Sequence, residues 1–185
     1  MHEVAPHTSC ALKHFLTYRK IVENQLPGAI VLEDDIILYP NFKKVFEELL
    51  REIDTQDIKN PIVYLEDDAL KFVPRSRRKK GQHLYRIVNS SHFTGCMYVT
   101  YGAAKHILDV VEREKTDLPI DVYHEYLLQH RDLNLLFCHP FIATQGSHTG
   151  LFASSINAQS AKKQKKRQYT WLLKKWYKQL LYFCR

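Results

Sequence analysis

The chain has 185 residues, of which 45% are hydrophobic and 12% aromatic, enough for one globular domain with its own core and too few for two domains of ordinary size. Its formal net charge is +7, but all 20 acidic residues lie at or before Asp132, whereas nine of the 27 Lys and Arg residues follow it. Residues 1–132 therefore carry −2 and residues 133–185 carry +9, which excludes a basic surface spread over the whole protein.

The cysteines and the apolar runs indicate the cellular location of the protein. The four cysteines are scattered, without the paired spacing of a zinc site or a redox couple, and this favours a reduced, cytosolic setting. Residues 1–9 do not resemble a signal peptide, and no apolar run approaches the ~20 residues needed to span a bilayer. We therefore expect a protein that is soluble or that sits on a membrane surface.

The first part of the chain alternates between helical and strand patterns. Apolar positions at helical spacing predict a helix over residues 10–25, which a Pro-Gly pair ends. The aliphatic run at residues 29–32 predicts a buried strand. Asn41 is expected to cap a strongly amphipathic helix that extends to about Ile53.

The same alternation continues to the C-terminus. The sequence predicts further strands and helices, in chain order: strands over 61–65, 83–88 and 96–101, helices over 102–111 and 119–130, a strand over 134–145, and a helix from 169 onward. Helices that alternate with short buried strands predict an α/β sheet flanked by helices. The last helix is expected to be basic and amphipathic.

Three consecutive carboxylates, Glu33, Asp34 and Asp35, follow the predicted strand at residues 29–32. An unpaired carboxylate is costly to bury, so the triplet requires either a cation or a turn into water. Ligands of α/β sheets bind outside the carboxyl ends of strands, and carboxylates together with phosphate oxygens are ordinary ligands of Mg²⁺ or Mn²⁺. The triplet is therefore a candidate clamp for a metal and a diphosphate, with a solvated acidic turn as the alternative.

A second triplet, Glu66, Asp67 and Asp68, follows the predicted strand at 61–65 in a similar sequence context. We expect Asp67 and Asp68 to form a solvated strand end, with contact to the acceptor or to a second cation as the alternative. Two acidic clusters are also compatible with a two-metal phosphodiesterase or nuclease, which is the main competing class of enzyme.

Several motifs, in order, resemble glycosyltransferase family 25, the family of lipooligosaccharide and collagen sugar transferases. The matching stretches are SCALKHFLTYRKIV, GAIVLEDDIILYPNF, HFTGCMYVTYGAAKHIL and PIDVYHEYLL. The residues that match the family pattern are Cys10, His14, Glu33, Asp34, Asp35, Phe42, Thr94, Gly95, Tyr98, Gly102, Ala103, Pro119 and Asp121. The resemblance covers residues 9 to about 150.

The resemblance also sets the expected domain boundaries. The family pattern has Ser where this chain has Lys13, and it has a strand and further elements before the Cys-His helix. We therefore expect residues 1–150 to form a family 25-like domain that is short of its N-terminal strand region. Residues 151–185 are expected to form a basic linker and an amphipathic helix.

The resemblance implies a GT-A-like mixed sheet and a reaction. A hexose, with galactose favoured, would be transferred with inversion from a UDP-sugar to a lipooligosaccharide or another surface-glycan acceptor. Asp34 and Asp35 would hold Mn²⁺ or Mg²⁺, and Glu33 would complete the cofactor-binding triplet by orienting either the turn or a water on the metal. The cation would neutralise charge on the leaving diphosphate. His148, in a late loop, is a candidate to complete the metal site or to contact the diphosphate, although ten histidines make coincidence the alternative.

An inverting displacement also requires a general base that reaches the acceptor hydroxyl. Asp121 is the candidate, and Glu125, one helical turn later, is the reserve. The alternative for Asp121 is a structural one, because a carboxylate just after Pro119 is favoured by the dipole at the first turn of a helix.

The basic segment at residues 162–185 combines lysines with Trp and Tyr at helical spacing. This pattern suits the anionic inner surface of a bacterial cytoplasmic membrane, where a peripheral enzyme would meet a lipid-linked oligosaccharide acceptor. The alternatives are an apolar face docked on its own domain, and an inactive or truncated remnant that acts as a basic membrane- or nucleic-acid-binding module. For the enzyme itself, no nucleic-acid partner is expected.

Overall fold

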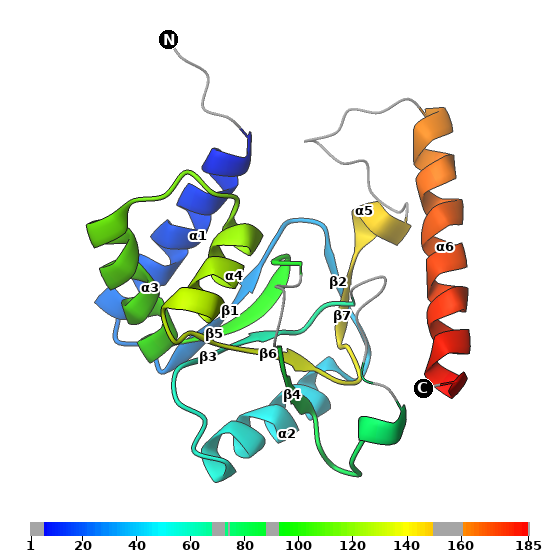
Figure 1. Cartoon of the computed structure of the whole chain (residues 1–185), viewed down its shortest axis with the longest axis horizontal. Coiled ribbons are helices and arrows are strands. Elements are labelled where there is room, and N and C mark those ends of the chain that lie inside the picture. The colour runs from blue at the N-terminus through cyan, green and yellow to red at the C-terminus, as the bar shows by residue number, and fades with distance from the viewer. Residues whose placement is uncertain (1–5, 68–72, 74, 88–92, 150–160, 185) are drawn as a thin grey trace.

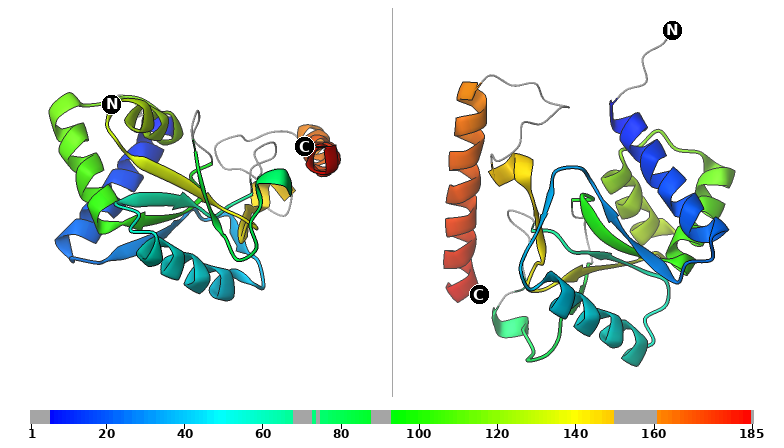
Figure 2. Two further views of the ribbon diagram at one scale, coloured as in Figure 1. Left: turned by 60° about the horizontal axis from the view of Figure 1, so that its bottom comes forward. Right: turned by 180° about the vertical axis from the view of Figure 1, so that it is seen from behind.

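The structure, a computed structural model, describes residues 6–67, 73, 75–87, 93–149 and 161–184. Its centre is a five-stranded sheet with helices on both faces (Figure 1). Helices α1, α3 and α4 cover one face, and α2 covers the other, as the turned views show (Figure 2). This arrangement confirms the predicted mixed α/β class.

The sheet has the strand order β1-β5-β3-β6-β4. Its strands are β1 (Gly28–Leu32), β3 (Pro61–Tyr64), β4 (Leu84–Arg86), β5 (Cys96–Thr100) and β6 (Asn134–Cys138). Strands β3 and β6 are parallel, whereas β5 is antiparallel to both β1 and β3. Strands β1, β3 and β6 therefore run in the same direction, and their carboxyl ends lie at one edge of the sheet.

The helices follow the apolar periodicity of the sequence. They are α1 (Pro6–Glu23), α2 (Phe42–Thr55), α3 (Tyr101–Glu114) and α4 (Ile120–His130). Helix α2 buries Val45, Leu49 and Ile53, which recur on one face, and these residues pack with Val63 and Leu65 of the sheet region. Asn41 precedes α2 as expected, but its side chain makes no capping hydrogen bond. The other face of the sheet packs against α1, α3 and α4 in a larger core cluster.

A buried histidine ties three of these elements together. The hydroxyl of Tyr18, on α1, lies 3.0 Å from Nε2 of His124, on α4, and the hydroxyl of Tyr64, on β3, lies 2.8 Å from Nδ1 of the same ring. His124 is fully buried, and this burial lowers its pKa to about 3. The neutral ring therefore holds α1 in a fixed place above the sheet.

The prediction of one strand over residues 134–145 was wrong. The segment forms two strands, β6 and β7 (Ala143–Gln145), which belong to different sheets because β7 pairs with β2 (Ile36–Leu38). Pro140 lies between them, and proline has no N–H with which to continue a strand ladder. Helix α1 begins earlier than predicted, and α3 continues three residues beyond the predicted end at residue 111.

The C-terminal helix α6 (Ala161–Cys184) begins before the predicted start at residue 169. It lies beside the short helix α5 (Gly146–Thr149), away from the helices that cover the five-stranded sheet (Figures 1 and 2). Trp171 is buried with 8% of its surface exposed. Among the described residues, no helix combines the length and the apolar character that a membrane crossing requires.

Candidate functional site

The two acidic triplets follow strands whose carboxyl ends lie at the same edge of the sheet, and Gly95 connects them. The backbone N–H of Glu33 donates to the carbonyl of Gly95 at 2.8 Å, and the N–H of Gly95 donates to Oε1 of Glu66 at 2.7 Å. A Cβ at position 95 would lie only 2.7 Å from Nε2 of Gln145 and 2.9 Å from Oε2 of Glu66. The absence of a side chain at Gly95 therefore allows the two acidic segments to approach each other.

The first triplet forms the turn between β1 and β2. The last residue of β7 and the two residues after it hold this turn in place. Glu33 accepts a 3.4 Å hydrogen bond from Gln145 at Oε2. The backbone N–H of Ser147 donates to Oδ2 of Asp35 at 3.3 Å, and that of Gly146 donates to the Asp35 carbonyl at 2.7 Å. The amino end of α5 therefore lies against Asp35.

The exposure of the three carboxylates differs. Asp34 is exposed to solvent, whereas Glu33 and Asp35 are half-buried. Oδ1 of Asp35 is buried and has no hydrogen-bond partner within the described residues. A buried carboxylate oxygen without a donor is an available ligand for a hard cation, so the donor set fits Mg²⁺ or Mn²⁺.

Glu66 is fully buried behind this turn. Burial raises its pKa to about 8, and the nearby charges of Glu33 and Asp35 add to the effect, while hydrogen bonds from Gly95 and Cys96 oppose it. Glu66 is therefore mostly protonated at neutral pH. A neutral Glu66 reduces the repulsion between carboxylates that meet at this edge.

The expectation of a solvated second triplet was wrong for Asp67. Asp67 has 9% of its surface exposed, and its Oδ2 lies 2.9 Å from Nζ of Lys175 on α6. The N–H of Asp67 donates to the carbonyl of Ala143, so the chain continues beside β7 instead of turning into water. Asp68 lies outside the described residues.

A third group of side chains stands beside the first triplet. One ligating atom each of Cys10, His14 and Glu33 lies within 4.8 Å of the others. Burial raises the pKa of the Cys10 thiol, and the charge of Glu33 raises it further. The sequence analysis named Cys10 and His14 only as residues that match the family pattern, and it did not predict that they meet Glu33 in a cluster of possible metal ligands.

The predicted bases lie on α4. Asp121 is in the first turn of the helix, and its Oδ1 accepts a 2.9 Å hydrogen bond from the N–H of Val122. Its charge also raises the pKa of Cys10, after the larger effects of burial and of Glu33. Glu125 is half-buried one turn later and accepts a 3.4 Å hydrogen bond from Gln129. His148 belongs to α5, but its side chain lies outside the described residues.

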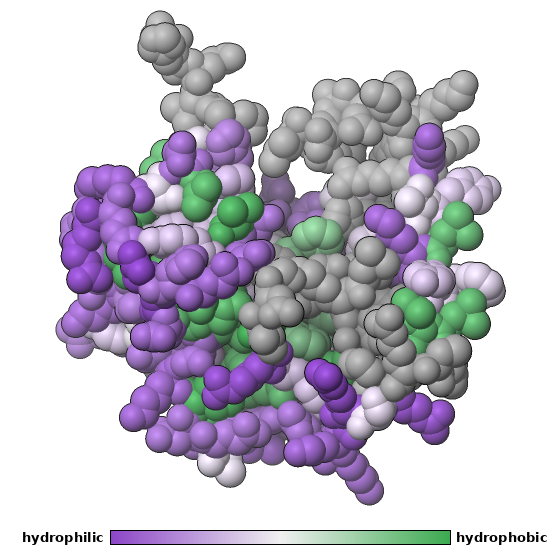
Figure 3. All heavy atoms as spheres, viewed as in Figure 1, coloured by the Kyte–Doolittle hydropathy of each residue, from purple (hydrophilic) through white to green (hydrophobic). Residues whose placement is uncertain are grey.

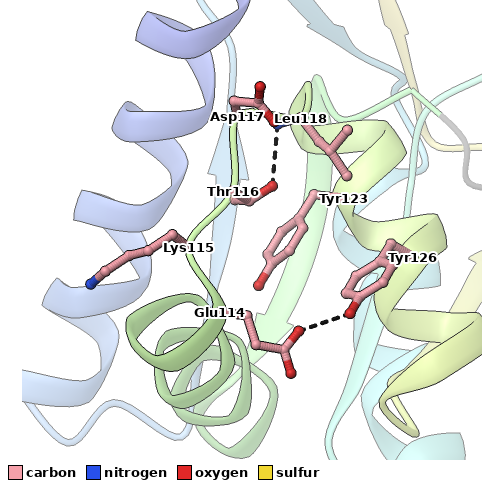
Figure 4. Close-up of a pocket in the computed structure, with 7 residues that line it drawn as sticks. All are labelled: Glu114, Lys115, Thr116, Asp117, Leu118, Tyr123 and Tyr126. Carbon is pink, nitrogen blue, oxygen red and sulfur yellow. Dashed lines mark hydrogen bonds between the residues drawn. The ribbon is translucent and has the colours of Figure 1, made fainter.

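A separate pocket of about 310 Å³ opens where α3 passes into α4 (Figure 4). Two tyrosines point toward Glu114 in this pocket, and the hydroxyl of Tyr126 donates to Oε2 of Glu114 at 2.8 Å. Its lining residues are Glu114, Lys115, Thr116, Asp117, Leu118, Tyr123 and Tyr126. None of the site residues predicted from the sequence lines this pocket.

These features define an α/β domain with a carboxylate-rich site at one edge of a mixed sheet. Comparison with known proteins gives its family. A sequence model described as glycosyltransferase family 25 (LPS biosynthesis protein) matches residues 5–124. The chain belongs to glycosyltransferase family 25.

Two curated relatives extend this comparison. The chain is similar to a procollagen galactosyltransferase 1 of Danio rerio, with 22% identity over 153 residues, 76% of this chain and 25% of the relative. It is also similar to a putative glycosyltransferase of Haemophilus influenzae, with 27% identity over 138 residues, 74% of this chain and 47% of the relative. The chain thus spans between a quarter and a half of the length of these relatives.

Proposed function

We propose that the protein is a metal-dependent, inverting glycosyltransferase. It transfers a hexose, galactose by preference, from a UDP-sugar to a lipooligosaccharide or another surface-glycan acceptor. The observation that carries the proposal is Oδ1 of Asp35, which is buried at an acidic sheet edge and has no hydrogen-bond partner in the part of the chain that the structure describes, in a chain of family 25. Residues 1–150 form the transferase domain in this proposal, and residues 151–185 form the segment that brings it to its acceptor.

Asp34 and Asp35 are the proposed ligands of Mn²⁺ or Mg²⁺, with His148 as a third candidate. When bound, the cation offsets the negative charge that grows on the UDP diphosphate as the glycosidic bond breaks. Glu33 and Gln145 hold the turn in place through their 3.4 Å hydrogen bond. The neutral form of Glu66 keeps a further negative charge away from the diphosphate.

Asp121 is the proposed general base. It accepts the proton of the acceptor hydroxyl while the hydroxyl oxygen forms its bond to the anomeric carbon and the bond to UDP breaks. Support for this role comes from the position of Asp121 in the first turn of α4, where its charge reaches the Cys10 cluster beside Glu33. Glu125 is the alternative base.

The two-metal phosphodiesterase is less well supported. Such an enzyme requires a second set of carboxylates free to hold a second cation. Asp67 is already 2.9 Å from the ammonium of Lys175, and burial raises the pKa of Glu66 to about 8. The second triplet is therefore poorly suited to hold another metal ion.

The decisive experiment is calorimetric titration of UDP into the 185-residue chain, with and without Mn²⁺. We expect binding that depends on Mn²⁺ and that is lost in Asp34→Ala and in Asp35→Ala. Asp54→Ala is the matched control, because Asp54 is an exposed carboxylate on α2. Binding that persists in both site variants, or that is absent from the folded wild-type chain, would overturn the donor-site proposal.

We further propose that α6 rests on the anionic inner surface of the bacterial cytoplasmic membrane. Large apolar side chains on α6 are exposed, and they gather on the outer side of the helix in Figure 3. They are Tyr169, Leu172, Leu173, Trp176, Tyr177 and Leu180. Since Trp171 and Lys175 form the inner side, the docked face differs from the apolar stripe. The exposed Lys166 and Lys174 lie on the same helix, and together with the stripe they suit an anionic surface.

Sedimentation with vesicles tests this surface. We expect the chain to bind phosphatidylglycerol vesicles and to bind phosphatidylcholine vesicles weakly. The double variant Leu173→Ser/Trp176→Ser should lose binding, whereas Leu12→Ser/Leu16→Ser, which removes exposed apolar residues from α1, should retain it. Stronger, salt-sensitive binding to DNA or RNA than to these vesicles would instead support the nucleic-acid alternative.

A further inference from the structure

The Cys10 cluster brings three kinds of ligating atom to one place. Cys10 and His14 are four residues apart on α1, so their side chains share one face of the helix. Glu33, immediately after β1, faces them, and its Oε1 lies 3.9 Å from Nε2 of His14. A sulfur, a nitrogen and an oxygen ligand thus come from two elements that pack together.

The distances between the three ligating atoms are slightly longer than those in a tetrahedral zinc site. The three ligating atoms lie within 4.8 Å of one another. Ligands of one tetrahedral zinc ion, at bond lengths of about 2.0 to 2.3 Å, stand roughly 3.3 to 3.8 Å apart. Because Cys10 and Glu33 are half-buried, rotation of their side chains can supply the difference.

His14 provides an independent observation that points to a ligand. Its side chain is 95% buried, and its ring makes no hydrogen bond within the described residues; Nδ1 is among the buried atoms that have no partner. Buried polar groups in proteins are normally hydrogen-bonded, so a buried imidazole whose Nδ1 has no partner among the described residues is unusual. An imidazole nitrogen that makes no hydrogen bond can serve as a ligand for a metal ion.

The surrounding charges favour a cation. Burial raises the pKa of the Cys10 thiol, and the negative charges of Glu33 and Asp121 raise it further, while the positive charge of Lys13 lowers it. Thiolate and imidazole ligands select zinc-class ions, whereas carboxylates alone suit Mg²⁺ and Mn²⁺. The Cys10 cluster is therefore expected to prefer a different class of metal ion from the neighbouring Asp34 and Asp35.

We propose that Cys10, His14 and Glu33 form a binding site for a zinc-class divalent cation, which joins α1 to the turn that begins the first acidic triplet. The fourth coordination position is left to water or another small ligand, as in open zinc sites. The site does not depend on the proposed transferase activity, because it is built from this chain's own ligands. The proposal implies two adjacent cation sites. Glu33 is a ligand of the zinc-class ion, and it directly precedes Asp34 and Asp35, the proposed ligands of Mn²⁺.

The test uses metal alone with the full 185-residue chain. Titration with Co²⁺ should produce the near-ultraviolet charge-transfer band of a thiolate–cobalt bond, and calorimetry should give one tight Zn²⁺ site per chain. Cys10→Ser should abolish the band, and His14→Asn should weaken Zn²⁺ binding by about 100-fold or more. His7→Asn, an exposed histidine on α1, and Cys184→Ser are the controls that should bind as wild type does.

Two outcomes would overturn the proposal: absence of the cobalt band in the wild-type chain, or its persistence in Cys10→Ser. If His14→Asn fails to fold, Cys10→Ser decides, because the half-buried thiol is replaced by a side chain of similar size. Asp35→Asn separates the two metal proposals. It should lose Mn²⁺-dependent UDP binding and keep the cobalt band; loss of the band in Asp35→Asn but not in Cys10→Ser would assign the metal to the acidic turn instead.

Discussion

The backbone N–H of Gly95 donates a 2.7 Å hydrogen bond to Oε1 of Glu66, and this bond joins the start of β5 to the end of β3. Glu66 is fully buried, and its Oε2 has no hydrogen-bond partner within the described residues. The carboxyl group of Glu66 thus connects the segment after β3 to the start of β5. Burial raises its pKa to about 8, which favours the protonated form at neutral pH.

The first prediction is a pH-dependent loss of stability caused by Glu66. The pKa of Glu66 is about 8 in the folded chain, against an ordinary value of 4.5. Between these values the unfolded chain has lost the proton and the folded chain keeps it, so stability falls as the pH rises. The unfolding equilibrium constant should increase by roughly tenfold per pH unit through this group, with the full effect reached above about pH 8.

Comparison with Glu66→Gln isolates this effect, because glutamine does not titrate. Urea unfolding from about pH 5 to about pH 8 should show the variant gaining stability relative to wild type as the pH rises. Glu47→Gln, on the exposed side of α2, should follow the wild-type curve. Parallel curves for Glu66→Gln and wild type would mean that Glu66 is ionised in the folded chain.

The second prediction concerns the missing side chain at Gly95. In Gly95→Ala, the new Cβ would meet Gln145, Glu66 and Ile36 at 2.7 to 2.9 Å, and these contacts come from three segments at the site. We expect a loss of about 1 to 3 kcal/mol in the free energy of unfolding, together with loss of Mn²⁺-dependent UDP binding. Urea unfolding and calorimetry measure the two effects.

Gly102→Ala is the matched comparison. The three atoms nearest to its Cβ would all belong to the side-chain amide of Asn60, which is exposed and can move away. Alanine inside a helix is also favoured over glycine by roughly 0.5 to 1 kcal/mol, so the net change should be small. Equal losses in the two variants would show that the close packing around Gly95 has no special importance.

The third prediction tests the proposed base. Asp121→Asn keeps the size of the side chain and an oxygen that can accept from Val122, but it cannot take a proton. Turnover, followed as UDP release with an accepted glycan, should fall by about 10² to 10⁴-fold while UDP affinity stays unchanged. If Glu125→Gln loses turnover and Asp121→Asn does not, Glu125 is the base.

Local sequence patterns were sufficient for most of the fold. The apolar spacing of Val45, Leu49 and Ile53 predicted α2, because a helix buries every third or fourth residue whatever it packs against. The division of residues 134–145 into β6 and β7 was not predicted. The apolar run continues across Pro140, and the pairing of β7 with β2 depends on a distant partner strand.

The site was predicted less completely than the fold, for a physical reason. The acidic turn was found because three adjacent carboxylates are visible in the sequence. The burial of Asp67 depends on Lys175, which is more than one hundred positions away, and the cluster of Cys10 with Glu33 depends on how α1 packs beside β1. These contacts depend on how distant segments pack in the folded chain, so a local sequence pattern cannot predict them.

The fourth prediction concerns the attachment of α6. Nζ of Lys175 lies 2.9 Å from Oδ2 of Asp67 and 5.6 Å from the centre of the Trp171 ring. Lys175→Met keeps the length of the side chain and removes its charge. We expect docking of α6 to weaken by about 1 to 2 kcal/mol, because the partly buried Asp67 loses a cationic partner.

Hydrogen exchange along α6 measures this change, since a less firmly docked helix opens more often. The exchange rate should rise in Lys175→Met and stay at the wild-type value in Lys174→Met, which removes an exposed lysine one position earlier. The double variant Lys175→Met/Asp67→Asn should recover part of the loss, because it leaves no unmatched charge at the contact. Equal exchange rates in both single variants would mean that α6 is held by Trp171 and its apolar neighbours instead of by this ion pair.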